Sequence, residues 1–211
     1  MPTPSDQVPF VATSANTAVL IIDVQPFFLD GWMSGEVEAL LSRLDYLLGV
    51  CRVHELPAIA TFEQPTADKG LLPERLERAF PEQGLRLTKD SFNCCGEPAI
   101  RAAIATLDRE CIAVAGGETD VCVLQSVLGL LGMGKRVMLL EDALFSSEPN
   151  TGPAIRRMEA AGAIPSTVKA FEYELRLTVS AGGTHRRIGA LLPGAVLPEP
   201  EAFPPVRPAG A

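Results

Sequence analysis

The chain has 211 residues, and 47% of them are hydrophobic, so it can bury the core of one ordinary domain. Its formal net charge of −8 disfavours nucleic acid or an anionic membrane surface as the main partner, because an acidic protein repels phosphates. No apolar run reaches the about 20 residues that a membrane-spanning helix needs, and the first residues lack the pattern of a signal peptide, so we expect a cytoplasmic protein.

The cysteines and histidines bear on the cellular compartment and on metal binding. None of the five cysteines forms a CxxC pair, and one is left over from any pairing, which fits a reducing compartment. A zinc site built on histidine would need both His54 and His185, from distant places in the chain. We therefore expect no bound metal and no cofactor.

The hydrophobic pattern predicts strands that alternate with helices. Residues 17–24 are a continuous apolar run rich in β-branched side chains, which is typical of a strand buried on both faces. From residue 36 to Cys51, apolar residues recur at steps of three and four, which predicts a helix with one apolar stripe. Further on, the pattern predicts strands at 57–62, 84–88, 111–116, 136–142 and 164–168, and helices at 73–80, 97–107, 120–133 and 151–161.

Six strands that alternate with helices imply an α/β fold with three α/β/α layers and a six-stranded parallel sheet, of the doubly wound, Rossmann-like type. We assign residues 1–192 to this single domain. Residues 193–211 are rich in proline and show no periodicity, so we expect a C-terminal arm there.

In an open parallel sheet, ligands bind at the carboxyl ends of the strands. Asp23 ends the first predicted strand, Lys89 ends the third, and Cys122 follows the fourth, so an acid, a base and a thiol fall on one edge. If Thr119 caps the next helix, Cys122 lies in the first turn, where the helix dipole and the Lys89 ammonium favour a thiolate. We therefore expect a thiol of lowered pKa, with Asp23 as the group that carries its proton.

Other residues near this edge are candidates for binding a small-molecule substrate. Two glutamines could orient an amide, and two phenylalanines could line a pocket, although each ring is equally a candidate for core packing. A glycine at the corner after the fourth strand would leave room for the substrate. These candidates are Gln25, Gln64, Phe28, Phe92 and Gly117.

Three segments resemble the signature blocks of the isochorismatase-like cysteine hydrolases. They are "LIIDVQPFF", "LTKDSF" and "AGGETDVCVLQSVLGLL", and their order and spacing match the family over roughly residues 15–180. The resemblance implies the six-stranded parallel sheet and a catalytic triad of Asp23, Lys89 and Cys122. It also implies a non-proline cis peptide before Glu118, an oxyanion hole formed by the N–H groups of Glu118 and Cys122, and a homo-oligomer.

The better-known activities of this family attack a carbonyl carbon that bears nitrogen, so the resemblance implies a hydrolase of small amide, carbamoyl or ureido compounds. The histidine metal site of the nicotinamidase branch has no counterpart in "TFEQPTADKGLLPERL". Gly117 stands where relatives usually carry a larger aliphatic residue, which would open the pocket or loosen the corner. Two alternatives stay open: an isochorismatase-type hydrolase of ethers or esters, and an oligomeric redox or binding protein without turnover.

Overall fold

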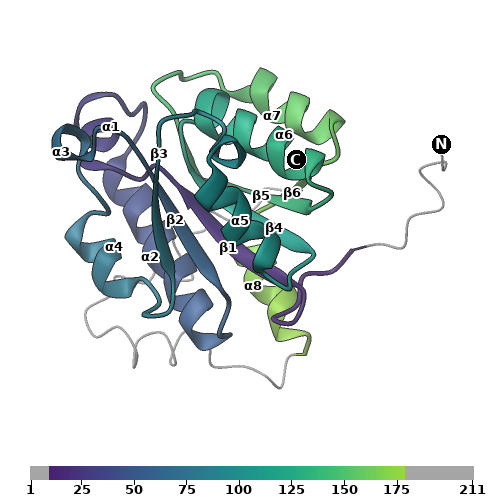
Figure 1. Ribbon diagram of the computed structural model, residues 1–211. Coiled ribbons are helices and arrows are strands. Elements are labelled where there is room, and N and C mark those ends of the chain that lie inside the picture. Colours follow the sequence, from purple (N-terminus) through teal and green to yellow (C-terminus); the bar gives the residue numbers. More distant parts are fainter. Residues whose placement is uncertain (1–9, 179–211) are drawn as a thin grey trace, which may run out of the picture.

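The computed structural model describes residues 10–178, which form a six-stranded sheet between two layers of helices (Figure 1). All strand pairs are parallel, and the order across the sheet is β3-β2-β1-β4-β5-β6. The strands are β1 (Thr17–Ile22), β2 (Ala58–Glu63), β3 (Leu85–Lys89), β4 (Cys111–Gly117), β5 (Arg136–Phe145) and β6 (Ile164–Ser166). The predicted fold class is thus confirmed.

Strand β1 lies in the middle of the sheet, and its neighbours explain why it is apolar throughout. Leu20 is in register with Ile59 of β2 on one side and with Val114 of β4 on the other. The chain first runs outward from β1 to β3 and then returns to β4, so the order reverses between β1 and β4. Such a switch point is where ligands bind in doubly wound folds.

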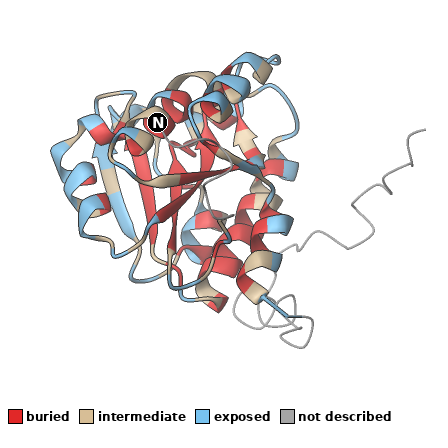
Figure 2. Cartoon of the chain, turned by 90° about the vertical axis from the view of Figure 1, so that its right-hand side faces the viewer, coloured by how far each residue is buried: buried red, intermediate tan, exposed pale blue. Residues whose placement is uncertain are grey.

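Helices cover both faces of the sheet, and the central strands β1 and β4 are buried, whereas the edge strand β3 is largely exposed (Figure 2). One layer consists of α2 (Val37–Val53), α4 (Glu74–Ala79) and α8 (Val168–Arg176), and the other of α5 (Pro98–Thr106), α6 (Leu124–Gly132) and α7 (Gly152–Ala160). Val19 and Ile21 of β1 face the first layer, whereas Leu20 and Ile22 face the second. This alternation produces two hydrophobic cores from one strand.

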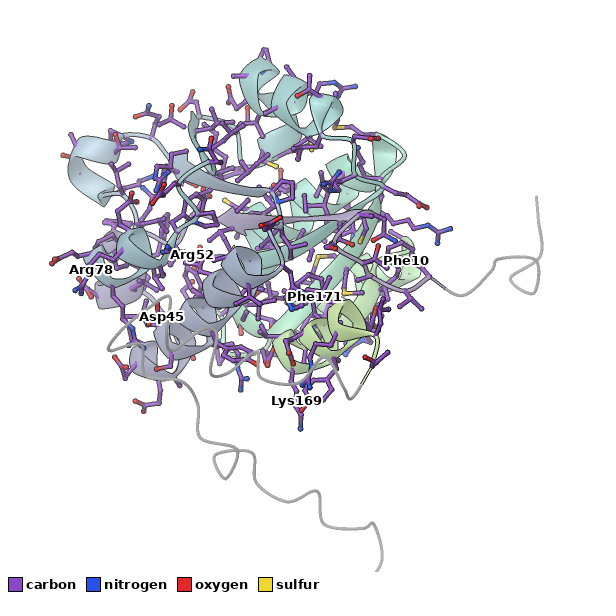
Figure 3. The ribbon with its side chains drawn as sticks, turned by 90° about the horizontal axis from the view of Figure 1, so that it is seen from below. Phe10, Asp45, Arg52, Arg78, Lys169 and Phe171 are labelled. Atoms are coloured by element: carbon purple, nitrogen blue, oxygen red, sulfur yellow. The ribbon has the colours of Figure 1, made fainter. Side chains whose placement is uncertain are left out.

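Polar and apolar contacts both hold the first helical layer together. Arg75 of α4 binds Asp45 of α2, with Nε 2.5 Å from Oδ2. Phe171 of α8 is fully buried in the core beside α2 (Figure 3). These contacts join α2, α4 and α8 in one layer. The single domain stays a prediction, and its expected boundary at residue 192 and the arm at 193–211 lie outside the described residues.

The structure adds three helices to the prediction and changes one. Two short helices, α1 (Pro26–Gly31) and α3 (Thr66–Lys69), follow the carboxyl ends of β1 and β2, and α8 follows β6. The helix predicted at 120–133 begins as a π-helical turn, Thr119–Val123, before α6. None of the helices between residues 10 and 178 combines the length and the apolar character needed to cross a membrane.

Candidate active site

Asp23 follows the last residue of β1 and is almost completely buried, with 1% of its surface exposed. Its backbone has a φ of 48°, a left-handed conformation that aspartate adopts more easily than most residues. The turn aims the side chain at β2, where the Thr61 hydroxyl donates a hydrogen bond to Asp23 Oδ1 at 3.0 Å. The carboxylate is therefore held at the switch point of the sheet.

Lys89 ends β3, and its side chain is completely buried among acidic and thiol groups. Its Nζ lies 2.6 Å from Asp23 Oδ2, 3.5 Å from Cys122 Sγ and 3.7 Å from Glu63 Oε2. A buried ammonium is tolerable only where carboxylates compensate its charge. The structure thus brings together the three residues that the sequence predicts to form a triad.

Cys122 lies in the π-helical turn after β4, and the path of the chain there depends on two glycines. Gly116 has a φ of +109°, and a Cβ atom on it would lie 2.1 Å from the Ile22 carbonyl oxygen, so only glycine fits. The Gly117–Glu118 peptide is cis, as predicted. Thr119 does not cap the helix, contrary to the prediction, because its hydroxyl donates to the Phe145 carbonyl oxygen at 2.9 Å.

Glu63, the last residue of β2, is a member of the site that the sequence prediction missed. The Cys122 thiol donates a hydrogen bond to Glu63 Oε2 at 3.3 Å, and Lys69 of α3 forms an ion pair with Oε1. The sequence offers one signal: Glu63 directly follows the strand predicted at 57–62, so it reaches the same carboxyl edge of the sheet as Asp23 and Lys89.

The charges around Cys122 contradict the expected low pKa of its thiol. Burial raises the pKa of Cys122, and the negative charges of Asp23 and Glu63 raise it further, while Lys89 only partly opposes them. Cys122 therefore rests as a thiol rather than as the predicted thiolate. A helix dipole alone would lower the pKa of the thiol, but burial and the two carboxylates beside the sulfur outweigh it.

The two carboxylates have pKa values displaced in opposite directions. Burial raises the pKa of Asp23 in spite of the Lys89 charge beside it. Burial also opposes the ionisation of Glu63, but its bonds with Lys69 and Cys122 hold its pKa below the ordinary value. Asp23 is thus suited to take up and release a proton, and Glu63 is suited to stay ionised.

The sulfur and the two carboxylates offer a set of ligand atoms that lie within 4.8 Å of one another. The atoms belong to Asp23, Glu63 and Cys122, and the Lys89 ammonium lies in contact with all three side chains. A metal ion at this place would have to displace Lys89. The positive charge that the carboxylates require is therefore supplied by the chain itself.

The side chain of Gln25, a predicted substrate-binding residue, is bonded to backbone groups of the protein itself. It is fully buried, and its Nε2 donates to the carbonyl oxygens of Glu63 and Gly70 at 3.1 and 2.8 Å. Its Oε1 accepts from the Glu63 N–H at 2.8 Å. The amide is engaged at both ends, so Gln25 positions Glu63 instead of orienting an amide substrate.

Gly117 also departs from its predicted role. A Cβ atom on Gly117 would lie 2.5 to 2.6 Å from three atoms of the Phe145 ring, so the space beside this glycine is already filled. The missing side chain does not open the pocket. It allows Phe145, at the end of β5, to pack against the corner that carries Cys122.

The other predicted binding residues surround the same edge at different depths. Phe28 of α1 is half-buried against the core, and its ring lies 5.2 Å from that of Phe27 in an edge-on arrangement. Gln64 is exposed, and its Oε1 accepts from the Thr66 N–H at 3.2 Å. Phe92, which follows β3, has 52% of its surface exposed. Each lies on a segment that follows the carboxyl end of β1, β2 or β3, and their contact with a substrate stays a prediction.

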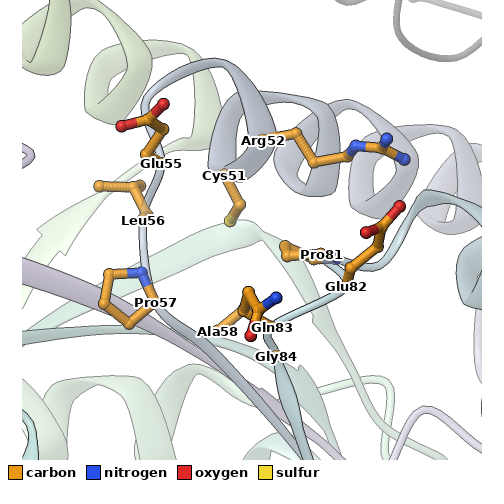
Figure 4. A pocket seen from close by; sticks show the side chains of 10 residues that line it. All are labelled: Cys51, Arg52, Glu55, Leu56, Pro57, Ala58, Pro81, Glu82, Gln83 and Gly84. Carbon is orange, nitrogen blue, oxygen red and sulfur yellow. The ribbon is translucent and has the colours of Figure 1, made fainter.

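A cavity of about 620 Å³ lies at the opposite edge of the sheet, where β2 and β3 begin (Figure 4). It is lined by Cys51, Arg52 and residues 55–58 and 81–84. None of the residues that surround Cys122 belongs to it, so this cavity is separate from the candidate active site.

Comparisons with known proteins agree with this architecture. The isochorismatase domain model matches residues 17–170. Isochorismatase family protein 1B of Dictyostelium discoideum is 27% identical over 183 residues, 84% of each chain. YcaC from Pseudomonas aeruginosa, solved with hexane-2,5-diol and covalent acrylamide, has a TM-score of 0.80 at 24% identity over 90% of this chain and 94% of that one. Escherichia coli YcaC, described as an octameric hydrolase of unknown specificity, has a TM-score of 0.79 at 22% identity over 90% and 93% of the two chains.

The two solved structures share the fold of this chain. The family model covers all six strands and the residues that meet around Cys122. The chain belongs to the isochorismatase family of hydrolases.

Proposed function

We propose that the protein hydrolyses the C–N bond of a small amide, carbamoyl or ureido compound through a cysteine acyl-enzyme intermediate. One observation carries this proposal: the Cys122 sulfur lies 3.5 Å from the Lys89 ammonium, which itself lies 2.6 Å from Asp23, at the carboxyl edge of the sheet. A nucleophile, a proton carrier and a fixed positive charge in one buried cluster suit acyl transfer.

In the first step, Cys122 Sγ attacks the carbonyl carbon while its proton passes to Asp23. The raised pKa of the thiol requires this transfer to accompany the attack, since little thiolate is present beforehand. The carbonyl oxygen becomes an oxyanion, held by the N–H groups of Glu118 and Cys122. Lys89 stabilises the negative charge that moves between Asp23 and the sulfur.

In the second step, the tetrahedral intermediate collapses. The C–N bond breaks, Asp23 returns its proton to the leaving nitrogen, and ammonia or an amine departs. A water molecule then attacks the thioester carbon and gives a proton to Asp23. The C–S bond breaks, the carboxylic or carbamic acid leaves, and Asp23 reprotonates the sulfur, so the enzyme returns to its starting state.

Residues around the mouth of the site are the expected substrate contacts, namely Phe28, Gln64 and Phe92. The structure of Pseudomonas aeruginosa YcaC holds covalent acrylamide, a small amide, so a protein of this fold can bind a compound of the proposed size and class. The octameric state of the Escherichia coli neighbour supports the expectation of a homo-oligomer, which size-exclusion chromatography with light scattering would test.

The test is a screen of amides, carbamoyl and ureido compounds for ammonia release, followed by Cys122→Ala with any compound that is turned over. We expect the variant to retain its fold and to lose activity by at least about a thousandfold, as for other nucleophile deletions. Wild-type turnover by Cys122→Ala would contradict the mechanism and would favour the ether or ester hydrolase. Oxidation of Cys122 by peroxide, with no acyl adduct from any amide, would favour the redox or binding protein.

A further inference from the structure

Two carboxylates flank the Cys122 thiol, but the mechanism proposed above uses only one of them. Asp23 carries the proton, and Glu63 has no part in any step. Yet Glu63 Oε2 accepts the hydrogen bond of the thiol at 3.3 Å, so the carboxylate faces the atom that attacks the substrate. A charged side chain in this position needs an explanation.

Two residues hold Glu63 firmly in this place through three contacts. Lys69 forms an ion pair with Oε1, and Gln25 binds both the N–H and the carbonyl group of the Glu63 backbone. The side chain is 13% exposed, compared with 0% for Lys89, so Glu63 lies on the outer side of the cluster. Oε2 is therefore fixed beside the sulfur, on the more exposed side of the cluster.

The distances allow the substrate nitrogen to reach Glu63. A carbonyl carbon that is ready to react lies about 3 to 3.5 Å from the sulfur. A nitrogen bonded to that carbon lies about 1.3 Å from the carbon. Because Oε2 lies 3.3 Å from the same sulfur, such a nitrogen can come within about 2.9 Å of Oε2, a normal hydrogen-bond distance.

We propose that Glu63 is a specificity-determining residue, whose Oε2 accepts a hydrogen bond from an N–H group on the carbon that Cys122 attacks. This inference rests on the proposed function and narrows its substrate class to carbonyl compounds whose nitrogen carries hydrogen. The bound N–H group replaces the thiol as the donor to Oε2 at the moment when the thiol gives its proton to Asp23.

Glu63 discriminates because an ionised carboxylate can only accept hydrogen bonds. A primary amide or carbamoyl nitrogen supplies a donor, and a bond to a charged group is stronger than one between neutral groups. A methyl group or an ester oxygen supplies none and leaves Oε2 without a partner. The ion pair with Lys69 and the hydrogen bond from Cys122 keep the pKa of Glu63 low, so the acceptor persists at neutral pH.

The test compares two esters that differ only beside the attacked carbon, 4-nitrophenyl carbamate and 4-nitrophenyl acetate. With either reagent, a bond forms between Cys122 Sγ and the carbonyl carbon, the bond to 4-nitrophenolate breaks, and the thiol proton goes to Asp23. The carbamate carries NH₂ where the acetate carries CH₃. Mass spectrometry of the Cys122 peptide gives the rate of each reaction, and the informative quantity is the ratio of the carbamate rate to the acetate rate.

We expect this ratio to fall by about tenfold in Glu63→Gln and further in Glu63→Ala, the loss expected for one hydrogen bond to a charged group. The exposed Glu82, at the opposite edge of the sheet, supplies the matched control Glu82→Gln, in which the ratio stays at the wild-type value. A change in the pKa of the thiol or in local packing alters both rates together and leaves the ratio unchanged.

The two proposals fail in different ways. If Cys122 is acylated but the ratio is the same in wild type, Glu63→Gln and Glu63→Ala, the role of Glu63 is overturned and the nucleophile stands. If neither ester acylates Cys122 faster than the buried Cys51, the proposed function itself is overturned. The use of two Glu63 variants keeps the test informative if one of them does not fold.

Discussion

The Lys89 ammonium lies 2.6 Å from Asp23 Oδ2, and the two side chains are 0% and 1% exposed. Removal of one member of such a pair leaves a buried charge without compensation. We expect Lys89→Met, which keeps the length of the side chain, to reduce the free energy of unfolding by about 3 to 5 kcal/mol, as measured by urea denaturation.

The pH dependence of this loss has a definite sign. In Lys89→Met, burial raises the pKa of Asp23 with no positive charge at 2.6 Å to oppose it, so the folded state binds a proton more readily than the unfolded state. The variant is therefore most stable at low pH and loses stability as the pH rises through the folded-state pKa. Asp23→Asn in the same chain should restore part of the loss at neutral pH. A loss that is independent of pH and of Asp23 would contradict this account.

The reactivity of Cys122 toward iodoacetamide should rise with pH up to values above the ordinary thiol pKa, because burial and the charges of Asp23 and Glu63 raise the pKa of the thiol. Asp23→Asn removes one of these charges, so labelling at a fixed pH below the pKa should accelerate by about tenfold for each unit by which the pKa falls. Turnover should decrease in the same variant, since the proton carrier is lost.

Peptide mass spectrometry measures this labelling, with Cys51 as an internal control whose pKa burial raises to about 12. Cys51 is a fully buried residue of α2 and should label slowly in both proteins. Fast labelling of wild-type Cys122 well below the ordinary thiol pKa would show that Lys89 outweighs the two carboxylates. It would also support the thiolate at Cys122 that the sequence predicts.

The sequence predicts those parts of the molecule that depend on local pattern and on the geometry of a parallel sheet. Strand β1 is recognisable because both of its faces are buried, and Asp23, Lys89 and Cys122 meet because the carboxyl ends of parallel strands share one edge. Helix α8 begins at Val168, the β-branched last residue of the strand predicted at 164–168, so the strand ends earlier than predicted and a helix follows it.

Features that depend on contacts across the fold were beyond the sequence. Burial raises the pKa of Cys122, and the charges of Asp23, Glu63 and Lys89 at the ends of three strands change it further. A helix dipole is only one contribution to this balance. From the sequence, the Thr119 hydroxyl could cap a helix or bond to another element. In the folded chain it donates to the Phe145 carbonyl oxygen of β5, a contact that depends on the tertiary structure. Glu63 directly follows the strand predicted at 57–62, but its contact with the Cys122 thiol depends on how the strands pair across the sheet.

The hydrogen bonds of Gln25 to the backbone of Glu63 and Gly70 should contribute to the stability of the protein. Gln25→Ala leaves the Glu63 N–H and the carbonyl groups of Glu63 and Gly70 without their partner in a buried place. We expect a loss of about 2 to 4 kcal/mol in the free energy of unfolding, since each unsatisfied buried group is costly. The exposed Gln125 of α6 supplies the control Gln125→Ala, which should change stability by less than about 0.5 kcal/mol. Equal effects of the two substitutions in thermal denaturation would refute the supporting role of Gln25.

Gly117 and Phe145 should behave as a coupled pair. A Cβ atom on Gly117 meets the Phe145 ring at 2.5 to 2.6 Å, so Gly117→Ala forces the ring or the corner to move, at a cost of about 1 to 3 kcal/mol. Gly132→Ala in α6 is the matched control, because a Cβ atom there has no neighbour within 4 Å. In Phe145→Leu, a side chain without a ring leaves space for the new methyl group, and the cost of Gly117→Ala should shrink.

A double-mutant cycle by urea denaturation measures this coupling, which should reach at least about 0.5 kcal/mol, the lower end for residues in contact. The turnover of Gly117→Ala should fall as well, because the corner that Phe145 packs against leads directly into the turn that carries Cys122. Additive effects in the cycle would show that the corner absorbs the methyl group on its own. In that case the glycine would be required by something other than the Phe145 ring, such as the close approach of a substrate to the backbone.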